Sequence, residues 1–68
     1  MSDLSKEFIL DSIEHYEEII SDYKDIIAKN EKILKSDCSD RRKEAAQVLI
    51  DISKGEIKVC QKEIRRLL

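Results

Sequence analysis

The chain has no proline and a single glycine, the two residue types that most often form turns and interrupt helices. It also lacks tryptophan, and aromatic residues make up 4% of it, which excludes a large aromatic core. Its 68 residues allow one small domain, which we expect to span 1–68. So short a chain buries a thin core and usually needs a metal, a disulfide, regular helix packing or a second chain. Abundant isoleucine, lysine and acidic residues point to long helices.

No apolar run approaches the ~20 residues that span a bilayer, and the start, Met-Ser-Asp-Leu-Ser, is polar. We therefore expect a soluble, cytoplasmic protein with no membrane partner. The net charge of −2 divides unevenly: residues 1–35 hold nine acids and five lysines, giving −4, and residues 36–68 hold six acids and eight bases, giving +2. Neither half is charged enough to require a nucleic acid or a membrane.

Apolar side chains recur at alternating steps of four and three residues from Ile9 to Leu34, which predicts one face of an α-helix. The helix is expected over about 4–35, with Ser2 or Ser5 as its N-cap. In heptad terms, Ile13, Ile20, Ile27 and Leu34 occupy a; Ile9, Tyr16, Tyr23 and Asn30 occupy d; Ile19, Ile26 and Ile33 occupy g. An a/d/g face is wider than the seam of a two-stranded coiled coil, so it needs more than one neighbouring helix.

A turn is predicted at 36–39, where Asp37 or Ser39 can cap a second helix over about 40–67. The seam of this helix is Ala46, Ile50, Ser53, Ile57, Cys60, Ile64 and Leu67, flanked by Leu49 at g and by Ala45, Ile52 and Val59 at c. One alternative is a single continuous helix of about 65 residues without a turn. Another is a third helix that begins after Gly55, although the seam stays in phase through that residue.

Two long helices joined by so short a turn form an antiparallel hairpin. The fold class is therefore all-α, and an isolated hairpin would leave a broad apolar face in water. That predicted interface comprises Ile19, Ile26, Ile33, Leu49, Ile52 and Val59. A second copy could cover this interface by forming a homodimeric four-helix bundle, and two-fold dimers are the commonest symmetric assembly. Alternatively, a different helical protein could cover it in a hetero-complex. Asn30 is expected to set the register by pairing with its symmetry mate or with a side chain of the second helix.

Like charges recur every four residues on both helices. Glu14, Glu18 and Asp22 form a possible acidic contact stripe; Lys54, Lys58, Lys62 and Arg66 form a basic stripe that could contact nucleic-acid phosphates. If facing residue numbers sum to about 76, Asp22 lies level with Lys54, which favours the hairpin over one long helix. Acidic residues interrupt the basic stripe and no aromatic residue lies in it, so a solvated surface is the simpler interpretation.

Chemical sites are sparse. His15 could join Asp11 and Glu18 on a metal, but a lone outward histidine is more often solvated, and no metal or other cofactor is expected. Cys38 and Cys60 would lie about 30 Å apart along the second helix, too far for a disulfide. Tyr16 and Tyr23 could stack on a ligand but fit core packing better. No catalytic residues can be assigned, because there is no nucleophile–base pair and no glycine-rich phosphate loop; we do not expect an enzyme.

The expected architecture is similar to that of the plasmid repressor-of-primer hairpin, with no residue motif in common. That family dimerises into a four-helix bundle and binds paired RNA loops. Because fold does not determine function, two hypotheses follow from the sequence. The first is a small interaction or regulatory protein that binds other proteins through a homodimeric bundle. The second is an RNA- or DNA-binding bundle that uses the basic stripe.

Overall fold

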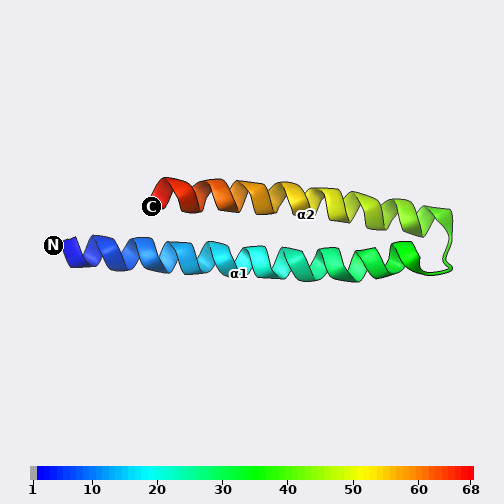
Figure 1. Cartoon of the computed structure of the whole chain (residues 1–68), viewed down its shortest axis with the longest axis horizontal. Coiled ribbons are helices and arrows are strands. Elements are labelled where there is room, and N and C mark those ends of the chain that lie inside the picture. Colours follow the sequence, from blue (N-terminus) through cyan, green and yellow to red (C-terminus); the bar gives the residue numbers. More distant parts are fainter. Residues whose placement is uncertain (1) are drawn as a thin grey trace.

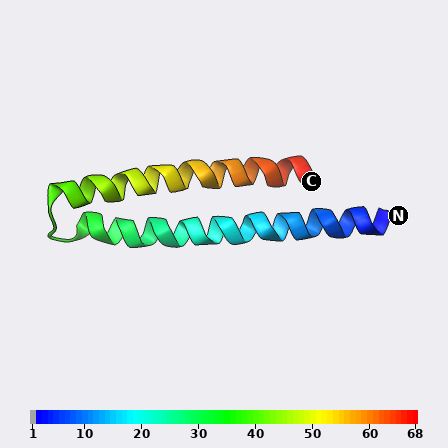
Figure 2. The ribbon, with the colours of Figure 1, turned by 180° about the vertical axis from the view of Figure 1, so that it is seen from behind.

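The protein is an all-helical hairpin of two helices that pack against each other (Figure 1). A computed structural model describes residues 2–68, with side chains from Ser5 onward. Helix α1 spans Ser2–Lys35 and helix α2 spans Asp40–Leu67. The helices run antiparallel, so both ends of the chain lie at the same end of a rod with extents of 57 × 14 × 11 Å (Figures 1 and 2). Neither described helix has an apolar stretch long enough to cross a membrane.

Helix α1 begins at Ser2, earlier than the predicted start near residue 4. The alternative cap at Ser5 is wrong, because Ser5 lies inside the helix, where its backbone continues the helical pattern. The side chain of Ser2 lies outside the described residues. At the other end, Lys32 and Lys35 occupy the last turn, where a positive charge interacts favourably with the helix dipole.

The loop between the helices is held at both ends by hydrogen bonds. The carbonyl of Ile33 accepts from the backbone N–H of Ser36 at 3.1 Å, from Ser36 Oγ at 2.7 Å and from Cys38 Sγ at 3.3 Å. Ser39 is the N-cap of α2, with an extended backbone and a side-chain oxygen that accepts from the N–H of Arg42 at 3.3 Å. Because α1 ends at Lys35 and Ser39 provides a new N-cap for α2, the chain is not one continuous helix.

The seam between the helices is narrow. In α2 the fully buried residues are Ala46, Ile50, Ser53 and Cys60, all at predicted seam positions. Two polar side chains lie in this seam and are bonded within their own helices. Ser53 Oγ donates to the carbonyl of Leu49 at 2.7 Å, and Asn30 Nδ2 donates to the carbonyl of Ile26 at 2.7 Å. The expected bond from Asn30 to an α2 side chain is therefore absent from the hairpin, because a carbonyl one turn back lies within easier reach of its short side chain.

Helix α2 continues through Gly55 without a break, which excludes the three-helix alternative. A Cβ placed on Gly55 would meet no atom within 4 Å, and its φ is not positive. Glycine in a helix costs about 1 kcal/mol relative to alanine. We therefore expect Gly55→Ala to raise the free energy of unfolding by about 1 kcal/mol. Urea denaturation followed by circular dichroism measures this change, and a loss of stability would contradict the open surroundings of Gly55 in the hairpin.

The loop determines where the second helix starts relative to the end of the first. Figure 1 shows α2 beginning farther out along the rod than α1 ends, because the loop first runs outward and then turns back. That facing residue numbers sum to about 76 stays a prediction. The basic stripe repeats every four residues, so a shift of one turn in either direction would keep opposite charges level.

Candidate interaction surface

Large apolar side chains remain exposed along both helices of the hairpin. Ile52 and Val59 are each 54% exposed, Leu49 is 47% exposed and Ile26 is 36% exposed. Ile19 and Ile33 are half-buried. These six residues are the predicted interface, and we call them the apolar face. Among the described side chains, the fully buried apolar residues are Ala46, Ile50 and Cys60, of which only Ile50 is large. The hairpin thus exposes more large apolar side chains than it buries.

The apolar face lies on one side of the hairpin. On the other side, a groove between the helices is lined by Glu17, Ile20, Ser21, Lys24, Gln61 and Ile64. Glu17, Lys24 and Gln61 all occupy heptad position e, so the e positions of both helices share that side. Positions e and g flank opposite sides of an a/d seam. The g positions of both helices therefore lie together on the side away from this groove, and the c positions of α2 continue that side outward.

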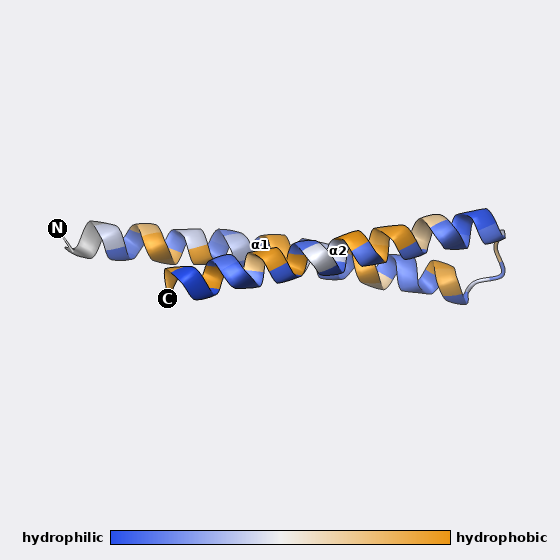
Figure 3. Ribbon diagram, turned by 90° about the horizontal axis from the view of Figure 1, so that it is seen from above, coloured by the Kyte–Doolittle hydropathy of each residue, from blue (hydrophilic) through white to orange (hydrophobic). Residues whose placement is uncertain are grey.

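Two exposed apolar residues on this side of the hairpin were not predicted from the sequence. Val48 is 55% exposed and lies one turn before Ile52. Phe8 is exposed on the same side of α1 as Ile19. Both fall outside the a, d and g positions, so the heptad pattern gave them no role. The signal available in the sequence was a large apolar residue one turn from a g or c position. Figure 3 shows hydrophobic residues recurring along both ribbons, which cross at a shallow angle.

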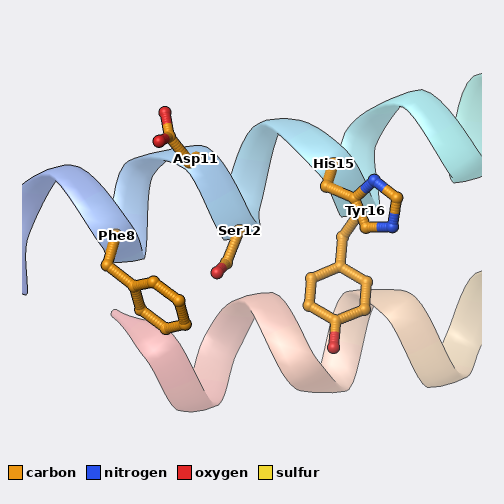
Figure 4. A pocket seen from close by; sticks show the side chains of 5 residues that line it. All are labelled: Phe8, Asp11, Ser12, His15 and Tyr16. Carbon is orange, nitrogen blue, oxygen red and sulfur yellow. The ribbon is translucent and has the colours of Figure 1, made fainter.

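A shallow hollow marks the end of the apolar face near the N-terminus. It is lined by Phe8, Asp11, Ser12, His15 and Tyr16, all from α1. Figure 4 shows Phe8, Ser12 and Tyr16 pointing to the side where α2 lies, whereas Asp11 points away. The rings of His15 and Tyr16 lie 6.1 Å apart, tilted by 54°. Because Phe8, Asp11 and His15 are exposed, the hollow is an open depression and does not enclose a ligand.

The two charged stripes lie at the surface, as a solvated role requires. Glu14, Glu18, Asp22, Lys54, Lys58, Lys62 and Arg66 are all exposed. Among the residues with described side chains, the one ion pair is Arg66 with Glu63, at 3.2 Å within α2. The opposite charges of the two helices therefore act on each other through solvent, where salt screens them.

The remaining candidate residues offer no assembled chemical site. His15 is exposed, and no group of three His, Cys, Asp or Glu side chains within the described part of the chain could hold a metal ion. Cys38 and Cys60 are free thiols. Cys60 is buried in the seam, whereas Cys38 is half-buried by the loop. Tyr16 and Tyr23 are half-buried, consistent with packing along the helix boundary.

Comparison with protein-family models, with curated proteins and with solved structures finds no match to this chain.

Proposed function

We propose that this protein is a small interaction or regulatory protein that binds other proteins and acts as a homodimeric four-helix bundle. One observation carries the proposal. The apolar face is one-sided and continuous over both helices, and the hairpin seam fully buries a single large apolar side chain among those described. Contiguous exposed apolar surface of this kind marks an interface.

The energetics agree with self-association. Removing the exposed half of a Val, Ile or Leu side chain from water stabilises by about 1 kcal/mol. Two copies of the apolar face bring together twelve apolar side chains, four of each copy's six being 36–54% exposed, so covering them offsets a large part of the association cost, about 4–15 kcal/mol. A lone hairpin below ~70 residues rarely gains enough from its own core. Covering the apolar face with a second copy supplies the missing burial with no other component.

The mass of the chain in solution tests the proposal. Light scattering over a dilution series should give a particle of twice the 8.0 kDa chain mass, with strong helical circular dichroism. A folded, fully helical monomer at micromolar concentration would contradict the homodimer. A weakly helical monomer would instead indicate that the apolar face covers a different helical protein.

The outer stripes are where such a bundle would contact other molecules. Glu14, Glu18 and Asp22 form an exposed acidic stripe on α1 that fits a basic protein surface.

The second candidate function is nucleic-acid binding by the basic stripe of α2. It is favoured by the exposure of Lys54, Lys58 and Lys62, none of which pairs with an acid among the described residues. RNA gel shifts at two salt concentrations distinguish protein binding from nucleic-acid binding. RNA binding that survives about 0.15 M salt would favour the nucleic-acid function.

A further inference from the structure

The apolar face can meet a second copy about either of two two-fold axes. If the axis runs along the rod, α1 packs on α2 of the second copy and both loops lie at the same end. If the axis crosses the rod at right angles, each helix packs on its own copy and the loops lie at opposite ends. Neighbouring helices are antiparallel in both arrangements, so helix direction does not choose between them.

The apolar stripes fit either axis, because they are evenly spaced and centred at one level. Their members are Ile19, Ile26 and Ile33 on α1 and Ala45, Ile52 and Val59 on α2. Counting from the loop, Ile26 is nine residues before the end of α1 and Ile52 is twelve after the start of α2. Because α2 starts farther out than α1 ends (Figure 1), the two central isoleucines lie nearly level. One axis can therefore pass both of them.

The charged side chains that border the apolar face do distinguish the two axes. Side chains at c and g lie on the side that faces a second copy, whereas those at b and f point outward, where solvent and salt screen them. Besides His15, the charged or titratable residues at c and g among the described side chains are Asp22, Lys29, Arg42, Glu56, Glu63 and Arg66. Their neighbours in the second copy decide between the arrangements.

An axis along the rod gathers carboxylates at one level. Such an axis leaves every residue level with its own copy, so the two Glu56 side chains would face the middle of the bundle from diagonal helices. Asp22 would lie level with Glu56 of the second copy, because each is four residues from a central isoleucine. Four carboxylates would then share one level, with no basic residue at c or g within a turn of them. Like charges held close together oppose this arrangement.

An axis across the rod pairs opposite charges instead. With Ile26 on the axis, Asp22 comes within one residue of the level of Lys29 in the second copy, and both occupy c. With Ile52 on the axis, Arg42 likewise comes level with Glu63 of the second copy, and both occupy g. By symmetry each pair occurs twice in the dimer. The residues that meet their own copies are Ile26 and Ile52, which are apolar.

The side chains in these pairs are available in the hairpin. Asp22, Lys29 and Arg42 are exposed, and none of them forms an ion pair with another described side chain. Glu63 is half-buried and pairs with Arg66 at 3.2 Å. A carboxylate can accept from two basic groups, so Arg42 of the second copy can bind Glu63 without displacing Arg66.

We infer that the second copy binds with α1 on α1 and α2 on α2, so that the loops lie at opposite ends of the bundle and the two-fold axis passes Ile26 and Ile52. The inference rests on the proposed homodimer and specifies which residues meet across it. It also places both acidic stripes on one side of the bundle and both basic stripes on the opposite side.

Disulfide trapping tests this topology in the full-length chain. In the background Cys38→Ser, Cys60→Ala, the variants Ile26→Cys and Ile52→Cys each carry a single thiol. A disulfide requires Cα atoms within roughly 7 Å. Each variant should form a covalent dimer in a glutathione redox buffer, because its thiol meets its own copy. Asp25→Cys is the matched control, because this exposed f position next to Ile26 points outward and should stay unlinked.

The opposite topology gives a different pattern of linkage. With the axis along the rod, identical thiols lie on diagonal helices about 14 Å apart. Neither single variant would then be linked, whereas a mixture of the Ile26→Cys and Ile52→Cys chains would be. Light scattering is run on the wild type and on each reduced variant. A dimer that links only in the mixture would overturn the topology and leave the homodimer standing, whereas a wild-type monomer would overturn both.

Charge exchange tests the same topology while leaving the apolar face unchanged. Asp22→Lys should raise the dissociation constant about tenfold, because it would face Lys29 of the second copy at two symmetric places. Adding Lys29→Asp should restore the dissociation constant to within about threefold of the wild type. With the axis along the rod, Asp22→Lys would instead meet Glu56 and tighten the dimer, so an unchanged or lowered dissociation constant overturns the inference. Asp25→Lys makes the same charge change at an outward position and is the matched control.

Discussion

Replacing Ile52 by aspartate should convert the proposed dimer to monomers, raising its dissociation constant by about 100-fold or more. Ile52 is 54% exposed in the hairpin, so the change removes little from its seam. In the bundle each copy would lose about 1 kcal/mol of apolar burial and would also bury a carboxylate, which costs more. Light scattering or analytical ultracentrifugation over a dilution series measures the shift, and circular dichroism checks that the helices persist.

The matched control for this prediction is Leu10→Asp. Leu10 is 57% exposed, close to Ile52, but it occupies an e position on the polar side of α1. The same substitution there should leave the dissociation constant within about threefold of the wild type, because surface changes usually alter stability by less than 0.5 kcal/mol. If both variants dissociate equally, the interface is not the apolar face. If neither does, the dimer does not use Ile52.

The second large effect should come from Ile50→Ala, two residues from Ile52 on the same helix. Ile50 is 2% exposed and is the one large apolar residue fully buried among the described side chains. Truncating a buried isoleucine costs about 2–5 kcal/mol. A scaffold of this size has only about 3–5 kcal/mol of stability from its core, so the variant should lose most of its stability and unfold at a much lower urea concentration.

Ile52→Ala is the partner experiment. We expect it to weaken association without changing the stability of the hairpin itself, because half of the side chain is already in water. Urea denaturation at several protein concentrations separates the two cases. The loss caused by Ile50→Ala should be the same at every concentration, whereas that caused by Ile52→Ala should appear only where the wild type is dimeric. Equal losses at low concentration would mean that Ile52 belongs to the hairpin core.

The sequence predicts the parts of this fold that depend on local spacing. The four-and-three pattern places Ala46, Ile50 and Cys60 on the buried seam, and a short polar segment ending in Ser39 predicts the turn and its cap. These features need only the helical period and the chemistry of one N-cap. The exposure of Ile52 and Val59 follows as well, because a two-helix hairpin cannot cover positions so far from its seam.

What the sequence could not predict depends on geometry between the helices. The register between the helices depends on the path of the loop, which is held by three hydrogen bonds to the Ile33 carbonyl. The partner of Asn30 was missed because a side chain within one helix competes with any side chain across the seam. Val48 was overlooked because a heptad label says nothing about how far an apolar arc extends around a helix.

The two thiols differ in burial and in position along the rod, so the rates at which a thiol reagent labels them report how the hairpin opens. Cys38 lies in the loop and is half-buried, so a thiol reagent reaches it after a small local movement. Cys60 is 5% exposed and lies toward the free ends, so its labelling requires α2 to leave α1 there. Helix ends open with lower free energy than the centre. The ratio of the two labelling rates therefore reports whether the hairpin unzips from its free ends or separates in one step.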